Sequence, residues 1–311
     1  MKGSASGIGS QPNPDANDVR ITNSMILARS LDSIQRGLAE SARLERRIAT
    51  GQQFQSLSEA PVAGRTVLTI DSDLRASEQF GRNAEAARSR LAVADAALNN
   101  VTNAMTRARE IALQQGSDVA TPESRLAAIE EVQELRASLV QLANTRLNEA
   151  YVFGGAYTDL QPLDATGALD PTFPARGAAR YAIAASTYAL GAPDAGEIFI
   201  DTEVMAALDD LEAALVADDQ AAIQAEGDRV RTVIASVQEL VAAVGARQIR
   251  VDTAESTRSV VDQTRIEQRA VLADASLEEA ITELAALQAS YQGSLLATSR
   301  LLQTSLVNYL R

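Results

Sequence analysis

The stretch that decides the fold runs from residue 84 to residue 112 and reads AEAARSRLAVADAALNNVTNAMTRAREIA. Its small or apolar residues recur at alternating steps of three and four, which places them along one side of an α-helix. This heptad-like repeat predicts a long helix that packs through that side. The nine residues of the seam are Ala84, Ala87, Leu91, Ala94, Leu98, Val101, Met105, Ala108 and Ala112.

The second half of the chain carries a matching pattern, with Arg247 where a seventh seam residue would fall. No proline occurs between Val62 and Thr121 or between Asp194 and Arg311. A helix from Arg229 to about Leu272 would be about 65 Å long, too long to surround a compact core. We therefore expect a mainly α fold, an elongated antiparallel helical bundle or coiled-coil rod formed by the two halves. The second seam is Val230, Val233, Val237, Leu240, Val244 and Val251.

A shorter helix is expected after Gly116. Thr121 is a candidate N-cap, because threonine side chains accept hydrogen bonds from the first turn, and Pro122 suits the first helical position. The seam pattern then resumes at Val132, Leu135, Leu139 and Leu142.

Residues 151–200 differ from both flanks, since they hold four of the eight prolines and seven of the eleven aromatic residues. This composition predicts a small β-rich insert at the far end of the rod. We expect short strands within RYAIAASTYAL (residues 180–190) and EIFID (residues 197–201), and a turn at Thr166 and Gly167.

The composition excludes several kinds of active site. The 311 residues include no Cys, His or Trp, so zinc sites with Cys or His ligands, cysteine nucleophiles and Ser-His-Asp triads are absent. We therefore predict that the chain is not an enzyme and has no cofactor or metal site. We interpret carboxylate pairs such as Glu130 and Glu131 as parts of solvated helix faces. The net charge of −13 disfavours nucleic acid and anionic lipid as partners. With no run of 18 apolar residues, no membrane insertion is expected.

The two ends of the chain show different features. Residues 1–18 have almost nothing apolar to bury, which predicts a disordered leader or an appended tag. Amphipathic stripes near both termini have no later element to cover them, and we interpret them as a subunit interface. The predicted interface residues are Leu27, Leu31, Ile34, Leu38, Leu277, Ile281, Leu284, Tyr291, Leu295, Leu302 and Tyr309.

Three runs of sequence resemble the flagellin and hook-associated protein superfamily of bacteria. Residues 19–68, VRITNSMILARSLDSIQRGLAESARLERRIATGQQFQSLSEAPVAGRTVL, look like the start of these proteins, and residues 276–311 are similar to their C-terminal helix. Residues 142–163, LANTRLNEAYVFGGAYTDLQPL, resemble the hook–filament junction subfamily, hook-associated protein 3. The residues that carry this last match are Asn144, Tyr151, Phe153, Gly155, Thr158 and Pro162.

The resemblance implies a structural protein that is exported by the flagellar type III apparatus and lies outside the cell in the flagellum. It implies inner-tube helices at residues 19–60 with 276–311, a rod-like domain at 61–150 with 201–275, and an outer insert at 151–200. Its partners would be copies of itself in a ring, the hook-side junction protein, flagellin and a cytoplasmic export chaperone. Two alternatives stay open, a small filament flagellin and, from a different class, a cytoplasmic coiled-coil adaptor.

Overall fold

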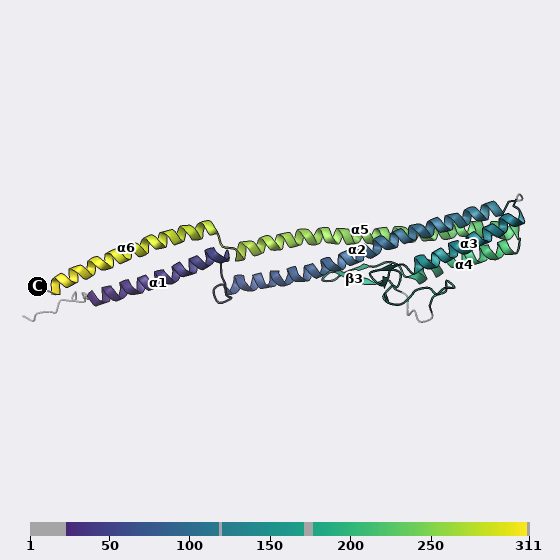
Figure 1. Ribbon diagram of the computed structural model, residues 1–311. Coiled ribbons are helices and arrows are strands. Elements are labelled where there is room, and N and C mark those ends of the chain that lie inside the picture. The colour runs from purple at the N-terminus through teal and green to yellow at the C-terminus, as the bar shows by residue number, and fades with distance from the viewer. Residues whose placement is uncertain (1–22, 118–119, 171–176, 310–311) are drawn as a thin grey trace, which may run out of the picture. The chain divides into compact units, whose positions relative to one another are not determined.

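The computed structural model describes residues 23–117, 120–170 and 177–309, so the predicted leader at residues 1–18 lies outside the described residues. The chain is mainly helical, with small two-stranded sheets between its third and fourth α-helices (Figure 1). Two compact units are present, one formed by residues up to Thr69 with those from Glu267 onward, the other by Ile70–Ile266. In chain order the elements are α1 (Asn23–Thr50), α2 (Pro61–Gln115), α3 (Pro122–Ala143), β1 (Arg146–Leu147), β2 (Ala150–Tyr151), β3 (Arg180–Ala184), β4 (Thr187–Leu190), η1 (Gly196–Ile200), α4 (Val204–Val216), α5 (Gln220–Ala273) and α6 (Leu277–Tyr309).

Helices α2 and α5 pair antiparallel in the second unit, as the two seams predicted. All nine seam residues of α2 are buried, and on α5 only Leu240 of the six is not fully buried. Three contacts fix the register along the pair: Ser77 Oγ donates to Asp262 Oδ2 at 2.6 Å, Arg88 pairs with Asp252 at 3.0 Å, and Gln224 Nε2 donates to the Gly116 carbonyl at 2.6 Å. The sequence separation of these partners shrinks steadily along α2, as antiparallel helices require.

Helices α3 and α4 complete a four-helix arrangement at the C-terminal end of α2. The predicted cap is confirmed, because Thr121 Oγ1 accepts from the Ser124 N–H at 3.2 Å and Ser124 Oγ accepts from the Thr121 N–H at 3.1 Å. Val132 and Leu139 of α3 are buried in the same core as most apolar residues of α4. The core is thus shared by four helices, whereas the sequence predicted two long helices and one shorter helix.

The position of the insert differs from the prediction, which placed it at the far end of the rod. That end is formed by the turn after α2 and by the start of α5, whose Gln220 and Gln224 side chains both donate to the Gly116 carbonyl. The sheets lie back along α2, where Asn83 Nδ2 donates to the Ala182 carbonyl at 2.8 Å (Figure 1). The reason is α3, which returns the chain by about 33 Å before the insert begins.

Two of the three local predictions in the insert are confirmed. β3 and β4 form an antiparallel hairpin within residues 180–190, and Gly167 at φ +77° completes the turn that the Asp164 side chain caps. The strand predicted at residues 197–201 is wrong, because Gly196–Ile200 forms the π-helix η1. Ile198 and Phe199 are adjacent and both buried, whereas a one-sided strand would bury only alternate residues. Asp194 Oδ1 also accepts from the Glu197 N–H, which starts a helical turn.

The first unit is an antiparallel pair of α1 and α6. Backbone hydrogen bonds join the segments beside the two helices, from the Gln53 N–H to the Ala273 carbonyl at 2.7 Å and from the Ala275 N–H to the Gly51 carbonyl at 2.9 Å. Leu44 and Ala280 are buried between the helices. The rest of this seam is only half-buried, so the pair has a thin apolar core. No helix in the described part of the chain is long and apolar enough to cross a bilayer.

Candidate assembly surface and the insert motif

The residues predicted as a subunit interface fall into three groups. Five of them have exposed side chains in the first unit, between 44% and 58% of their area. Three others, Ile34, Leu284 and Tyr291, are half-buried in the seam between α1 and α6. The side chains of Leu27, Leu302 and Tyr309 lie outside what the structure describes. The five exposed residues are Leu31, Leu38, Leu277, Ile281 and Leu295, called below the apolar stripe.

The apolar stripe lies on one side of the helix pair. At about 100° per residue, Leu31 and Leu38 lie about 90° around α1 from the seam formed by Ile34 and Leu44. The stripe residues of α6 lie about 75° from their own seam. Because the helices run antiparallel, these two rotations turn both parts of the stripe toward the same side.

The opposite side of the same pair is polar. Arg47 of α1 and Glu283 of α6 form an ion pair there at 3.8 Å. A hollow of about 270 Å³ on that side is lined by Arg36, Glu40 and three serines at its polar part and by Ile34, Leu287 and Tyr291 of the seam. The first unit therefore presents one apolar side and one polar side. An exposed apolar side is typical of a surface that binds another protein.

The six motif residues come together where α3 leads into the insert. The Asn144 side chain clamps Leu163, because its Nδ2 donates to the Leu163 carbonyl at 2.9 Å and its Oδ1 accepts from the Leu163 N–H at 3.1 Å. The Tyr151 N–H donates to the Thr158 carbonyl at 2.7 Å, and the buried Pro162 accepts from the Asp170 N–H at 3.1 Å. These contacts fold the loop after β2 onto the end of α3.

The remaining motif residues close the same loop against η1. Phe153 is buried and meets Phe199 edge to face, with ring centroids 6.2 Å apart. Gly155 has φ +59°, and a Cβ built there would lie 2.5 Å from the Gly177 carbonyl oxygen. All six residues therefore hold the insert together from within, which distinguishes them from the apolar stripe.

Replacing Gly155 with alanine tests how tightly this loop is packed. We expect Gly155→Ala to lower the free energy of unfolding by about 1–3 kcal/mol, because the left-handed backbone and the clash with the Gly177 carbonyl add up. Urea denaturation followed by circular dichroism measures the change. Gly245→Ala is the matched control, since a Cβ at this helical glycine meets nothing within 4 Å. Equal stability of the two variants would contradict the packing described.

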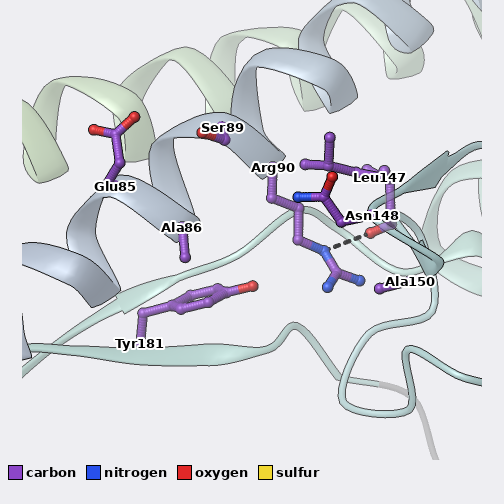
Figure 2. A pocket seen from close by; sticks show the side chains of 9 residues that line it. Glu85, Ala86, Ser89, Arg90, Leu147, Asn148, Ala150 and Tyr181 are labelled. Atoms are coloured by element: carbon purple, nitrogen blue, oxygen red, sulfur yellow. Dashed lines mark hydrogen bonds between the residues drawn. The ribbon is translucent and has the colours of Figure 1, made fainter.

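Arg90 is the functional residue that sequence reasoning missed. Only 7% of Arg90 is exposed, so its side chain is buried. In the sequence it is one of several arginines on this helix and precedes the seam residue Leu91. Figure 2 shows the guanidinium reaching from α2 toward the insert beside a hollow of about 240 Å³. Its Nε donates to the Val152 carbonyl at 3.0 Å, and its Nη2 donates to the Tyr151 carbonyl.

A second arginine fastens the insert to α5. Arg247 Nη1 donates to the Gly191 carbonyl at 2.7 Å, which explains why a charged residue occupies a seam position. The sequence did indicate this contact, because Arg247 interrupts the apolar pattern of the α5 seam. Arg90 gave no such signal, because it stands beside the seam and not in it.

The electrostatics of the second unit are those of structural ion pairs. Hydrogen bonding to Arg107 lowers the pKa of the Glu131 carboxyl, and the Thr166 hydroxyl lowers the pKa of Asp164. Burial is the largest cause that raises the pKa of Glu197. Among the described residues, no group of three or more acidic side chains could hold a metal ion. The arrangement supports packing between surfaces better than it supports a reaction.

Comparisons with known proteins agree with this description. A family model described as the bacterial flagellin N-terminal helical region matches residues 21–158. The flagellar hook-associated protein 3 of Salmonella typhimurium is 26% identical over 151 residues, which are 48% of this chain and 48% of that protein. The chain thus spans about half the length of this curated relative in the match.

Solved structures share the fold. The crystal structure of Xanthomonas campestris FlgL has a TM-score of 0.56 at 17% identity, covering 65% of this chain and 99% of that one. The flagellar junction protein FlgL from Legionella pneumophila has a TM-score of 0.55 at 16% identity, covering 67% and 99%. At these identities the likeness establishes the fold.

Proposed function

We propose that this chain is a structural, non-enzymatic subunit of the bacterial flagellum at the hook–filament junction, because residues 21–158 match the model of the bacterial flagellin N-terminal helical region. The relative in Salmonella typhimurium is named hook-associated protein 3, and the relative in Legionella pneumophila is called a flagellar junction protein. Both names favour the junction over the filament as the site of this subunit.

The observation that carries the proposal is the apolar stripe. Leu31, Leu38, Leu277, Ile281 and Leu295 are exposed on one side of a two-helix unit whose own core is thin. Burying a large aliphatic side chain contributes about 1.5–3 kcal/mol. Because these side chains are about half exposed, covering the stripe would contribute a fraction of this per residue and so stabilise a contact between subunits.

This function assigns roles to the parts of the chain. Residues 19–60 with 276–311 would form the inner tube, 61–150 with 201–275 the rod, and 151–200 an outward insert. The partners would be copies of this chain in a ring, the hook-side junction protein on one side and flagellin on the other. Before assembly, the subunit would be held by an export chaperone and would leave the cell through the flagellar type III apparatus.

Deletion of the gene tests the proposal against the two alternatives. A junction subunit predicts intact hooks, no filaments, and flagellin released unpolymerised into the medium. Electron microscopy of the cells and immunoblots of the medium measure both features, and a plasmid copy of the gene should restore filaments. Loss of all flagellin from cells and medium would instead identify the chain as the filament flagellin. Normal flagella with the protein retained in the cytosol would support the adaptor.

A further inference from the structure

The outward face of α5 carries no charge over more than six turns. Between Ala242 and Thr264, the residues that point away from α2 are all neutral, although charged side chains are frequent elsewhere on this helix. At about 100° per residue, Arg250 and Asp252 lie about 75° or more from the centre of this face. Ile249 and Val260 stand out from it, each 68% exposed. The face consists of Ala242, Ala246, Ile249, Thr253, Ser256, Val260 and Thr264.

Two of the three hydroxyl groups on this face, those of Thr253 and Thr264, are already hydrogen-bonded within the helix. Thr253 Oγ1 donates to the Ile249 carbonyl at 2.8 Å, and Thr264 Oγ1 donates to the Val260 carbonyl at 3.0 Å. Both threonines can therefore be covered by another surface without losing a hydrogen bond to water that nothing replaces. The α5 face behaves as an apolar ridge on which Ile249 and Val260 are the two highest points.

A complementary face lies on α2. Ala92, Ala96, Asn99 and Asn103 are exposed, neutral and small, and they follow one another at helical spacing. The Asn99 amide donates to the Asp95 carbonyl at 2.9 Å, so part of its hydrogen bonding is also internal. Eleven residues separate Ala92 from Asn103, as they separate Ile249 from Val260, or about 16 Å along either helix. The low α2 face is thus as long as the interval between Ile249 and Val260, the two most exposed apolar residues of the α5 face.

We propose that a second copy of this chain packs the ridge of its α5 onto the Ala92–Asn103 face of α2. The charge of −13 argues for this occupant, because copies of one acidic chain repel each other and meet at the lowest electrostatic cost through faces that carry no charge. Large aliphatic side chains on one helix and small ones on the other allow the close approach, about 8–10 Å between axes, at which helices pack. A basic partner would be expected to select the charged faces. The inference rests on the proposed function and deepens it, since it names the contact between neighbouring copies.

Cross-linking of assembled flagella tests this contact, and the absence of cysteine from the chain makes it specific. The deletion strain is complemented with the full chain carrying Ala96→Cys and Ile249→Cys, and isolated flagella are treated with a short bis-maleimide. The matched control carries Gln79→Cys with Ile249→Cys, because Gln79 is exposed on α2 and lies about 130° around the helix from the neutral face. We expect a ladder of dimers and higher multiples for the first variant, at least about tenfold more abundant than for the control.

The outcomes separate this inference from the proposed function. If filaments form with both variants but the ladder is missing, or is equally strong in the control, the α2–α5 contact is wrong and the junction function stands. A product with the mass of this chain plus flagellin would likewise overturn the second copy as occupant. If the unmodified gene fails to restore filaments to the deletion strain, the proposed function itself fails, whatever the cross-links show.

Discussion

Cells whose only copy of this gene carries Leu295→Asp are expected to make hooks but few or no filaments. Leu295 is exposed in the apolar stripe, so the substitution should leave the folded chain within about 0.5 kcal/mol of its original stability. In an assembled junction the same carboxylate would be buried against a neighbour without a partner. Even a cost of about 1.4 kcal/mol lowers each affinity tenfold, and the cost repeats at every subunit. Counts of filaments by electron microscopy and flagellin in the medium measure the effect.

The control for this experiment is Ala286→Asp, which adds the same charge to the same helix. Residue 286 is exposed and lies about 140° around α6 from Ile281, away from the stripe. It should assemble like the unmodified protein, and both variants should retain the helical circular dichroism spectrum. Normal filaments with Leu295→Asp would show that the stripe does not form the subunit contact.

Arg90→Met is expected to destabilise the second unit by about 2–4 kcal/mol. Methionine keeps the aliphatic stem, but the carbonyls of Tyr151 and Val152 lose the donors that now satisfy them in a buried site. The insert should loosen from α2 before the helices separate. Urea denaturation followed by circular dichroism gives the free energy, and limited proteolysis reports earlier cleavage between residues 144 and 203.

Arg82→Met provides the matched comparison on the same helix. Arg82 is exposed, and its Nη2 donates to the Gln79 side chain one turn earlier. Its replacement should change the free energy of unfolding by less than about 0.5 kcal/mol. If Arg90→Met were equally mild, the insert would be held mainly by its apolar contacts, such as that of Phe153 with Phe199.

The long helices were predictable from sequence because their information is local. The seam from Ala84 to Ala112 repeats a single periodicity over about eight turns. A residue that departs from the pattern at one position therefore does not change the prediction of a helix. The cap at Thr121 was equally local, since its partner Ser124 lies three residues away. Helix type and approximate length therefore followed from the chain itself.

The insert was harder because neighbours decide its conformation. Glu197 to Asp201 has the apolar, β-branched composition of a strand, but the packing of Phe199 on Phe153 and the Asp194 cap select a π-helix. Arg90 looks like any surface arginine in sequence, and only the return of the chain along α2 buries it. Its hydrogen-bond acceptors are backbone carbonyls, which every residue type has, so the sequence does not indicate them.

The amphipathic helices near the two termini also show which features the sequence predicts and which depend on tertiary packing. Sequence alone determined that the helices near both ends are amphipathic, because spacing within a helix reports which side chains share a face. It could not assign each apolar residue to the seam or to the exterior, since the two directions differ by only about a quarter turn. The antiparallel pairing of α1 with α6 decided that Leu284 and Tyr291 face inward while Leu277, Ile281 and Leu295 stay exposed. A helix specifies its own faces, but only the partner helix decides which of them is covered.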